Sequence, residues 1–118
     1  MLQLISWGAL ALIHVLPAIA VFYPPMITKL YGVATGGDIF LLLHHRAALF
    51  LVIVVLCIWA AFDPAVRRIA SVCVAISMIS FLGIYWSAGS PPALRSIAIA
   101  DLAGMPVLAF VCWKAFAA

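Results

Sequence analysis

The side chains of this chain that could do chemistry are few, and several of them interrupt long apolar runs. His44, His45 and Arg46 stand side by side within DIFLLLHHRAALFLVIVVLCIWAAF, which covers residues 38–62. His14 and Asp101 lie within two other apolar runs. Imidazole and carboxylate groups can exchange protons near neutral pH, and a guanidinium binds anions through paired hydrogen bonds. What these groups can do therefore depends on the helices that position them.

Composition predicts an integral membrane protein. Hydrophobic residues make up 69% of the 118 residues, charged residues only 8%, and the mean hydropathy is +1.36. A helix that crosses a bilayer needs roughly 20 mostly apolar residues. The chain contains such runs at about residues 2–22, 38–62, 66–86 and 93–116. The sequence therefore predicts an all-α fold, a single domain over residues 1–118 built as a compact antiparallel bundle of transmembrane helices.

This organisation excludes several classes of function. Little of the 118 residues is left outside the four runs, so no soluble catalytic domain fits between them. The net charge of +3 rests on only nine charged side chains and does not indicate nucleic-acid binding. The first run has no Lys or Arg before it, so we interpret it as a spanning helix and not as a signal peptide. Any chemistry is expected inside or between the helices.

Capping residues and prolines predict where three of the helices begin. Asp63 precedes Pro64, and Ser90 precedes Pro91, which predicts side-chain N-caps followed by proline at the first helical position. Asp38 follows two glycines and is expected to cap the second run, where its charge suits the positive end of the helix dipole. The longest connection, residues 23–37, is expected along the membrane surface, and its apolar pattern is too short to predict a helix.

The charge distribution predicts the orientation. The N-terminus, the connection at Asp63 and the C-terminus form one end of the bundle, called here the first end, and the two other connections form the second end. Lysines and arginines are retained preferentially on the cytoplasmic side. The first end carries three and the second end two, namely Arg67, Arg68 and Lys114 against Lys29 and Arg95. We expect both termini in the cytoplasm and the protein in a bacterial inner membrane.

Polar side chains from all four runs are expected to form one layer. Each lies eight or nine residues from the second end, or roughly 12 Å at a rise of about 1.5 Å per residue. The members of this layer are His14, Arg46, Ser77 and Asp101. Pro17 and Pro106 lie close to it, and each removes a backbone hydrogen bond, which is tolerated where protein or water replaces it. The pattern favours a hydrated pocket in the bundle.

An ion pair is predicted within this layer. A lone charge inside a membrane costs about 2.5 to 3.5 kcal/mol on insertion scales, so Arg46 is expected to pair with Asp101. His44 and Arg46 are about 200° apart on a helical wheel, so His45 is the histidine expected to share the inward face. Asp38, His44 and Arg95 are secondary candidates for the pocket. The same cluster could instead only fix how the helices pack.

Haem and metal sites are weighed as alternatives. His14 with His44 or His45 could supply two axial haem ligands from facing helices. Cys57, Cys73 and Cys112 all fall near the first end, where a soft metal could bind thiolates. The sequence has no CxxC motif, and buried cysteine commonly serves as a small apolar residue. We expect no resident cofactor and no catalytic metal.

Aromatic and small residues follow membrane patterns. Small side chains recur at Ser96, Ala100 and Gly104, a spacing that favours close helix contacts. Tryptophan and tyrosine near helix ends are typical of the membrane interface. The residues expected there are Trp7, Tyr23, Tyr31, Trp59, Tyr85, Trp86 and Trp113.

Three segments resemble a group of small bacterial four-helix membrane proteins of unknown function. They are LYGVATGGDIFLLLHHRAALF, SFLGIYWSAG and LRSIAIADLAG, at residues 30–50, 80–89 and 94–104. Such proteins are often labelled phosphopantetheine adenylyltransferase, but this chain has no HxGH-type motif, no phosphate-binding glycine loop and no α/β pattern. The resemblance implies the four-helix fold and a pattern that includes Asp38, His45, Arg46 and Asp101. It implies no reaction.

The sequence leaves three functional hypotheses open. The leading one is a small inner-membrane module, more a binding protein than an enzyme, that binds or conducts a small solute, ion or proton. It could act alone, as a homo-oligomer or as an accessory subunit of a partner membrane protein. The second is an intramembrane haem or metal redox protein or enzyme. The third is a purely structural membrane subunit.

Overall fold

The computed structural model describes residues 1–117, and these residues form helices and connections without a strand. The long helices are α1 (Leu2–Ile19), α3 (Gly37–Phe62), α4 (Arg67–Ser87) and α5 (Arg95–Phe116). A short helix, α2 (Pro25–Tyr31), lies between α1 and α3, and single 3₁₀ turns, η1 (Pro64–Val66) and η2 (Pro92–Leu94), precede α4 and α5. Four segments are long and apolar enough to cross a membrane.

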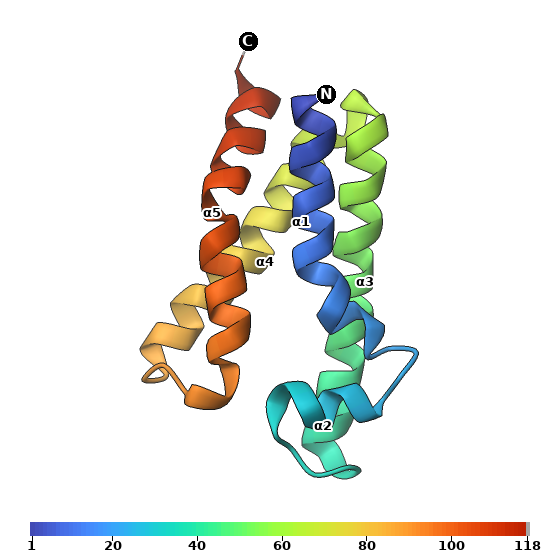
Figure 1. Ribbon diagram of the computed structural model, residues 1–118, viewed down its shortest axis with the longest axis vertical. Helices are drawn as coiled ribbons and strands as arrows, with labels where there is room; N and C mark the ends of the chain where they lie inside the picture. Colours follow the sequence, from blue (N-terminus) through green and yellow to red (C-terminus); the bar gives the residue numbers. More distant parts are fainter. Residues whose placement is uncertain (118) are drawn as a thin grey trace.

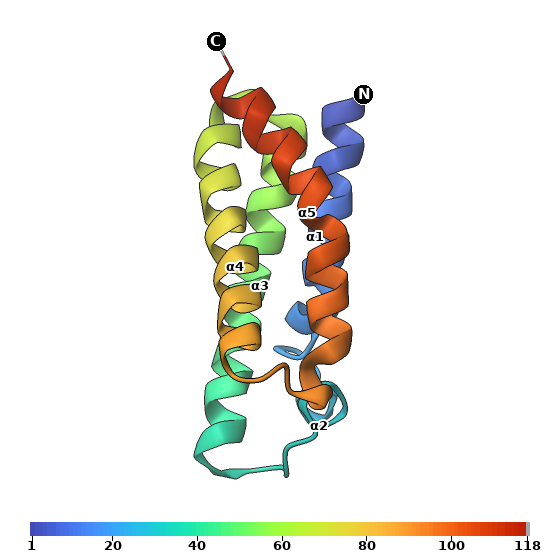
Figure 2. The ribbon, with the colours of Figure 1, turned by 90° about the vertical axis from the view of Figure 1, so that its left-hand side faces the viewer.

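The four long helices run up and down side by side (Figure 1). Contacts join α1 to α3, α3 to α4, α4 to α5 and α5 back to α1, so each long helix has two neighbours. Both termini and the α3–α4 connection lie at the first end, and α2 and the α4–α5 connection lie at the second end (Figures 1 and 2). The expected up-and-down order of helices is therefore what the structure contains.

The first helix is shorter than predicted. The apolar run extends to residue 22, but α1 ends at Ile19. Beyond it, the amides of Ala20, Val21 and Phe22 bond the carbonyls three residues earlier, which is a tighter turn than an α-helix makes. Pro17 in the last turn of α1 has no amide to donate, so the regular hydrogen bonding is already interrupted there.

The connection after α1 contains the helix α2, which the sequence pattern did not predict. Pro25 occupies its first position, and Gly32 ends it in the left-handed conformation with φ 68°. Ile27 and Tyr31 are buried. α2 contacts η2, α1 and α3, so it covers part of the second end of the bundle.

One of the predicted N-caps forms and two do not. The Asp63 carboxylate accepts a hydrogen bond from the Ala65 amide at 2.9 Å, and Pro64 takes the first position of η1, as predicted. Ser90 has φ 55° and caps nothing, because η2 starts one residue later than expected with Pro91 as its N-cap. Asp38 lies in the first turn of α3, and Gly36 takes the N-cap position without a side-chain bond. The carboxylate of Asp38 can still favour the helix dipole from there.

The core is tightest near the first end and the middle of the bundle. Trp7, Leu10, Val74 and Val111 are fully buried there. A Cβ placed on Gly104 of α5 would lie 2.5 Å from Ile13 Cδ1 and 2.9 Å from Met78 Cε, so α5 approaches α1 and α4 through this glycine. Small residues permit such contacts between apolar helices.

Three of the seven aromatic residues expected at the membrane interface are buried within the bundle. Trp7 has no exposed surface and its indole Nε1 has no partner within residues 1–117, while Tyr31 and Tyr85 are each 8% exposed. These rings serve as core residues, because a large apolar ring near a helix end can also fill the space between helices. The four exposed rings are Tyr23, Trp59, Trp86 and Trp113.

Candidate functional site

Arg46 of α3 is surrounded by aromatic rings. Its guanidinium carbon lies 4.8 Å from the ring centre of Phe50, 5.3 Å from that of Phe81 and 5.6 Å from that of Tyr31. These distances lie in the range of cation–π attraction. The guanidinium also donates one hydrogen bond, from Nη1 to the Tyr31 hydroxyl at 3.3 Å. Three helices, α2, α3 and α4, thus supply the rings around one cation.

The predicted ion pair is not formed. Within residues 1–117, no carboxylate oxygen lies within 4.0 Å of the Arg46 guanidinium, and the Tyr31 hydroxyl is its hydrogen-bond acceptor. Aromatic faces take the place that Asp101 was expected to fill. The sequence did not predict the contact between Arg46 and Tyr31, because α2, which carries Tyr31, was not predicted as a helix.

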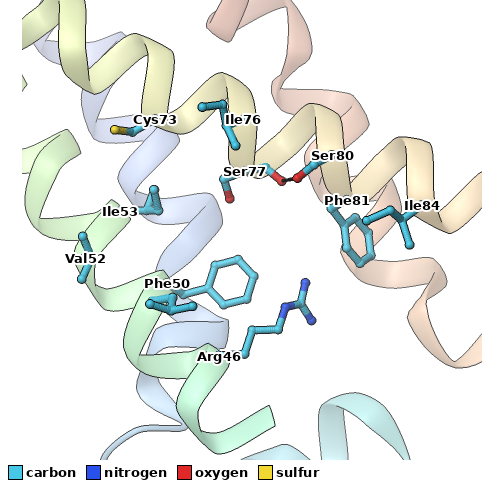
Figure 3. A pocket seen from close by; sticks show the side chains of 11 residues that line it. Arg46, Phe50, Val52, Ile53, Cys73, Ile76, Ser77, Ser80, Phe81 and Ile84 are labelled. Atoms are coloured by element: carbon cyan, nitrogen blue, oxygen red, sulfur yellow. Dashed lines mark hydrogen bonds between the residues drawn. The ribbon is translucent and has the colours of Figure 1, made fainter. Parts of the chain in front are cut away.

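A cavity of about 420 Å³ lies between α3 and α4 beside Arg46. Figure 3 shows Arg46 reaching from α3 toward the part of α4 that carries Ser77, Ser80 and Phe81. The polar residues of its lining are Arg46, Ser77 and Ser80, and Cys73 adds a weakly polar thiol. The other walls are apolar, formed by Leu49, Phe50, Val52, Ile53, Ile76, Phe81 and Ile84. This cavity, called the α3/α4 cavity below, is large enough for a small organic ligand.

His14 is 1% exposed and is oriented by its own helix. Its Nδ1 donates to the Leu10 carbonyl at 2.8 Å, so Nε2 of the neutral ring is an acceptor. The Ser77 hydroxyl of α4 approaches that nitrogen at 3.5 Å, a long contact that joins α1 to α4. The imidazole also lies 5.8 Å from the Phe50 ring.

Asp101 is 7% exposed and has no hydrogen-bond or ion-pair partner within residues 1–117. It lines a second cavity of about 90 Å³, together with His14 and Ser96. Phe50 lines this α1/α5 cavity and also the α3/α4 cavity. The residues of the polar layer predicted from the sequence thus line two cavities that share Phe50, with Arg46 and Ser77 in one and His14 and Asp101 in the other. The contact between Ser77 and His14 connects the two groups.

The prediction that His45 faces inward is wrong. His45 is exposed, whereas His44 is half-buried and donates from Nε2 to the Val21 carbonyl at 3.1 Å. The wheel argument assumed one inward face for this helix. In the bundle α3 contacts both α1 and α4, so it has two inward faces, with His44 directed to the end of α1 and Arg46 to α4.

The secondary candidates lie apart from this centre. Asp38 and Arg95 are exposed near the second end. Asp38 lines a shallow hollow with Gly36 and Gly37, where no other charged side chain takes part. Neither residue lines the α3/α4 or the α1/α5 cavity.

The geometry does not bring together the residues considered for haem or metal. His44 is engaged with a backbone carbonyl, and it shares neither cavity with His14. Cys57 is buried in the core, Cys112 lies 3.9 Å from the Ser71 carbonyl, and Cys73 faces the α3/α4 cavity. Within residues 1–117, no group of three or more His, Cys, Asp or Glu side chains is placed to hold a metal ion.

Tyr31, Phe50, Phe81 and Ser80 belong to the site, and the sequence pattern did not select them. Their types are ordinary in an apolar chain, so no motif marks them. A signal for Phe50 was present in the spacing, because Phe50 follows Arg46 by four residues and therefore lies on the same helix face. Burial raises the pKa of the Tyr31 phenol, and nearby Arg46 lowers it less, so the hydroxyl keeps its proton at neutral pH.

Comparison with known proteins does not identify a family. No family model, no curated protein and no solved structure matches this chain. The function has to be inferred from the site itself.

Proposed function

We propose that this protein is a small polytopic membrane protein that binds an anionic solute within the bilayer, with Arg46 as the binding cation. The outward faces of the four long helices support insertion, because side chains such as Leu12, Leu41, Ile76 and Ile99 are 57 to 72% exposed. Apolar surface on this scale is unfavourable in water and favourable in lipid. The charge count and the resemblance support a bacterial inner membrane with both termini in the cytoplasm.

The observation that carries the proposal is the state of the Arg46 guanidinium. A guanidinium has five N–H donors, and within residues 1–117 this one donates a single hydrogen bond. The aromatic rings compensate part of the cost of burying the charge, by about 0.5 to 2 kcal/mol for each favourable ring. The remaining donors border a cavity and can bind a carboxylate or phosphate through charge-assisted hydrogen bonds.

Serine hydroxyls would complete the binding wall. Ser77 and Ser80 line the same cavity on α4, opposite Arg46 on α3. The Ser77 hydroxyl is directed to His14 Nε2 at 3.5 Å. The Ser80 hydroxyl donates a long hydrogen bond of 3.4 Å to the Ser77 carbonyl, and by rotating from this contact it can donate to an oxygen atom of an anion instead. The arrangement offers donors from two helices to one ligand and holds no carboxylate that would repel it.

Titration with sodium octanoate in lipid nanodiscs tests this function. Octanoate is expected to raise the melting temperature of the wild-type protein, with octanol and octylammonium chloride giving no comparable rise. Arg46→Gln should weaken octanoate binding by roughly tenfold to hundredfold, since hydrogen bonds to charged groups contribute about 1.5 to 3 kcal/mol. Arg95→Gln is the matched control, because Arg95 is exposed near the same end and outside the cavity.

Equal octanoate binding by wild-type protein and Arg46→Gln would contradict the proposal. Arg46→Lys covers the case in which Arg46→Gln does not fold, because lysine keeps the charge and loses the paired donors. It should bind octanoate more weakly than wild-type protein while eluting as the same species in gel filtration.

A second candidate function is the binding of a proton or small cation in the α1/α5 cavity. Its polar lining consists of hydrogen-bond acceptors, namely the Asp101 carboxylate, His14 Nε2 and the Ser96 hydroxyl oxygen. Ile13 also lines it, and its carbonyl lacks the usual amide donor because residue 17 is proline. An infrared band of a protonated carboxyl group, present in wild-type protein and lost in Asp101→Asn, is expected if a proton occupies the site.

A further inference from the structure

We infer that the anionic solute is a single-chain amphiphile, a long-chain carboxylate, that enters the α3/α4 cavity sideways from the bilayer. This inference rests on the proposed function, because it assumes that Arg46 binds an anion. It adds the chemical class of the ligand, its direction in the cavity and its route. The carboxylate lies at Arg46, and the chain extends toward the first end.

The cavity is polar toward one end and apolar toward the other. On α3, Arg46 is the lining residue closest to the second end, and Val52 and Ile53 follow toward the first end. On α4, which runs the opposite way, the hydroxyls of Ser77 and Ser80 lie between Ile84 and Cys73. A ligand that matches this lining has its charge at the Arg46 level and its apolar part directed toward Val52 and Cys73.

The cavity is elongated along the helices. Its lining on α4 extends from Cys73 to Ile84, eleven residues, which is roughly 16 Å at about 1.5 Å per residue. About 12 Å of this length lies between Phe81 and Cys73, on the first-end side of the guanidinium. Phe81, next to the guanidinium, lies six residues before the end of α4 at Ser87, or about 9 Å. The charged group is therefore near the end of the helix, and the chain lies deeper.

The cavity is open on its lipid-facing side. Its rim consists of apolar side chains that are themselves exposed, with Leu49 at 55%, Val52 at 54%, Ile76 at 64% and Ile84 at 67%. None of these residues belongs to α2, which covers the second end. An amphiphile dissolved in the bilayer can therefore enter between α3 and α4 without displacing α2.

A helix of a second copy fits this cavity less well because its charges would not match. Copies inserted in the same direction place Asp38 at the second end and Asp63 at the first end, and Asp101 is buried in its own bundle. No exposed carboxylate of a neighbouring copy would therefore reach the depth of Arg46. The volume also favours one chain, since about 420 Å³ is near the lower limit for sites of drug-sized ligands.

Photolabelling tests the class and direction of the ligand. Palmitate with a diazirine at the chain end, or next to the carboxylate, is incorporated with the protein into phosphatidylcholine vesicles, and the labelled peptides are identified by mass spectrometry. The chain-end probe is expected to label Val52, Cys73 and Ile76, and the carboxylate-end probe Phe81 and Ile84. Unlabelled palmitate should compete, and palmityl alcohol should not.

Filling the deep part of the cavity separates this inference from the proposed function. Cys73→Trp should lower palmitate labelling by roughly tenfold, because the added ring fills the deep part of the cavity, whereas the dependence of octanoate binding on Arg46 is measured separately and tests the proposed function alone. Ile79→Trp is the matched control, since Ile79 is on α4, is 54% exposed and does not line the cavity.

The outcomes distinguish failure of the amphiphile inference from failure of the proposed function. Labelling of Leu12 and Leu16 on α1 as strong as that of the cavity, the reverse order of labelling, or a crosslink between copies in place of labelling would overturn the inference. If those results occur while octanoate binding still depends on Arg46, the proposed function stands without the amphiphile. If octanoate binding is independent of Arg46, the proposed function itself fails.

Discussion

The two ends of the bundle use their arginines differently. At the first end, Arg67 donates to the carbonyls of Ala60 and Ala61 at 2.7 and 3.2 Å, and Arg68 donates to the carbonyl of Ala115 at 3.0 Å. These carbonyls belong to the last turns of α3 and α5, which lack intrahelical donors. Toward the second end, Arg46 donates to no backbone carbonyl within residues 1–117 and instead lies over aromatic rings beside a cavity.

This difference is the basis of the proposal that Arg46 is a binding cation, whereas Arg67 and Arg68 are structural cations. Arg67 and Arg68 satisfy helix ends and join α4 to its two neighbours, so their donors are committed to the fold. Arg46 keeps most of its donors free at a cavity wall. Mutations at the two ends should therefore affect different quantities, which are thermodynamic stability at the first end and ligand binding at Arg46.

The largest expected effect is on octanoate binding by Arg46→Gln. We expect a loss of roughly 1.5 to 3 kcal/mol in binding free energy. The melting temperature of the ligand-free protein should change little, because the lost contacts are one hydrogen bond and cation–π attraction, and an unpaired buried charge is removed with them. Differential scanning fluorimetry with and without octanoate measures both quantities. A large loss of stability with normal binding would reverse the comparison.

At the first end, Arg67→Gln is expected to lower stability by about 1 to 3 kcal/mol, because two carbonyls of α3 lose their donor. Octanoate affinity should remain within about twofold of wild-type protein. Unfolding in a detergent titration, followed by circular dichroism, provides the stability, and Lys114→Gln is a control at the same end whose ammonium lies over Trp113. Unchanged stability would show that Arg67 is not a structural cation.

Larger side chains should lower stability where α5 packs closely against α1 and α4, and should have little effect on stability at the α3/α4 cavity. Gly104→Val is expected to lower stability by about 1 to 3 kcal/mol, because its side chain would meet Ile13 and Met78 at the tight seam of α5 with α1 and α4. Ser80→Val in the open seam should leave stability within about 0.5 kcal/mol. Equal effects in the same unfolding titration would argue against an open α3/α4 cavity.

A smaller effect is expected for Tyr31→Phe. The phenylalanine keeps the ring beside Arg46 and removes the hydroxyl that accepts its hydrogen bond. Octanoate affinity should fall by no more than about threefold, because the lost hydrogen bond orients the guanidinium and is not made to the ligand. Tyr23→Phe, on an exposed tyrosine outside the cavity, is the control. A stronger loss than that of Arg46→Gln would make Tyr31 the main binding group.

The smallest effect concerns Arg46 and Asp101. Because no ion pair within 4.0 Å joins them, the double mutant Arg46→Gln with Asp101→Asn should show a coupling in stability of about 1 kcal/mol or less, from Coulomb attraction without direct contact. A coupling of several times this value would restore the ion pair that the sequence predicts.

The order and type of the helices were predictable from the sequence, because a long apolar segment in lipid satisfies all of its backbone hydrogen bonds by forming a helix. The bounds of α3, α4 and α5 agree with the predicted runs within a few residues, and Asp63 caps as expected. Local chemistry decides these features. The shorter α1 and the helix α2 depend on prolines and on packing against η2, which the apolar pattern does not encode.

The candidate site was predictable only in part. The structure places His14 beside Ser77 and in one cavity with Asp101, whereas Arg46 is directed to aromatic rings. The direction of each side chain was not predictable, because it depends on how many neighbours a helix has. For this reason His44, and not His45, is directed inward. Arg46 lies beside aromatic rings, and α2 supplies one of them, Tyr31.

Solid-state NMR on palmitate labelled with ¹³C at its carboxyl group, bound to protein with ¹⁵N-labelled arginine, tests the central claim most directly. The account predicts dipolar dephasing of the carboxyl carbon by guanidinium nitrogens, consistent with N to O distances of about 2.7 to 2.9 Å. The dephasing should disappear in Arg46→Gln and persist in Arg95→Gln. Dephasing that is absent from the wild-type protein, or that survives in Arg46→Gln, would contradict the assignment of Arg46 as the binding cation.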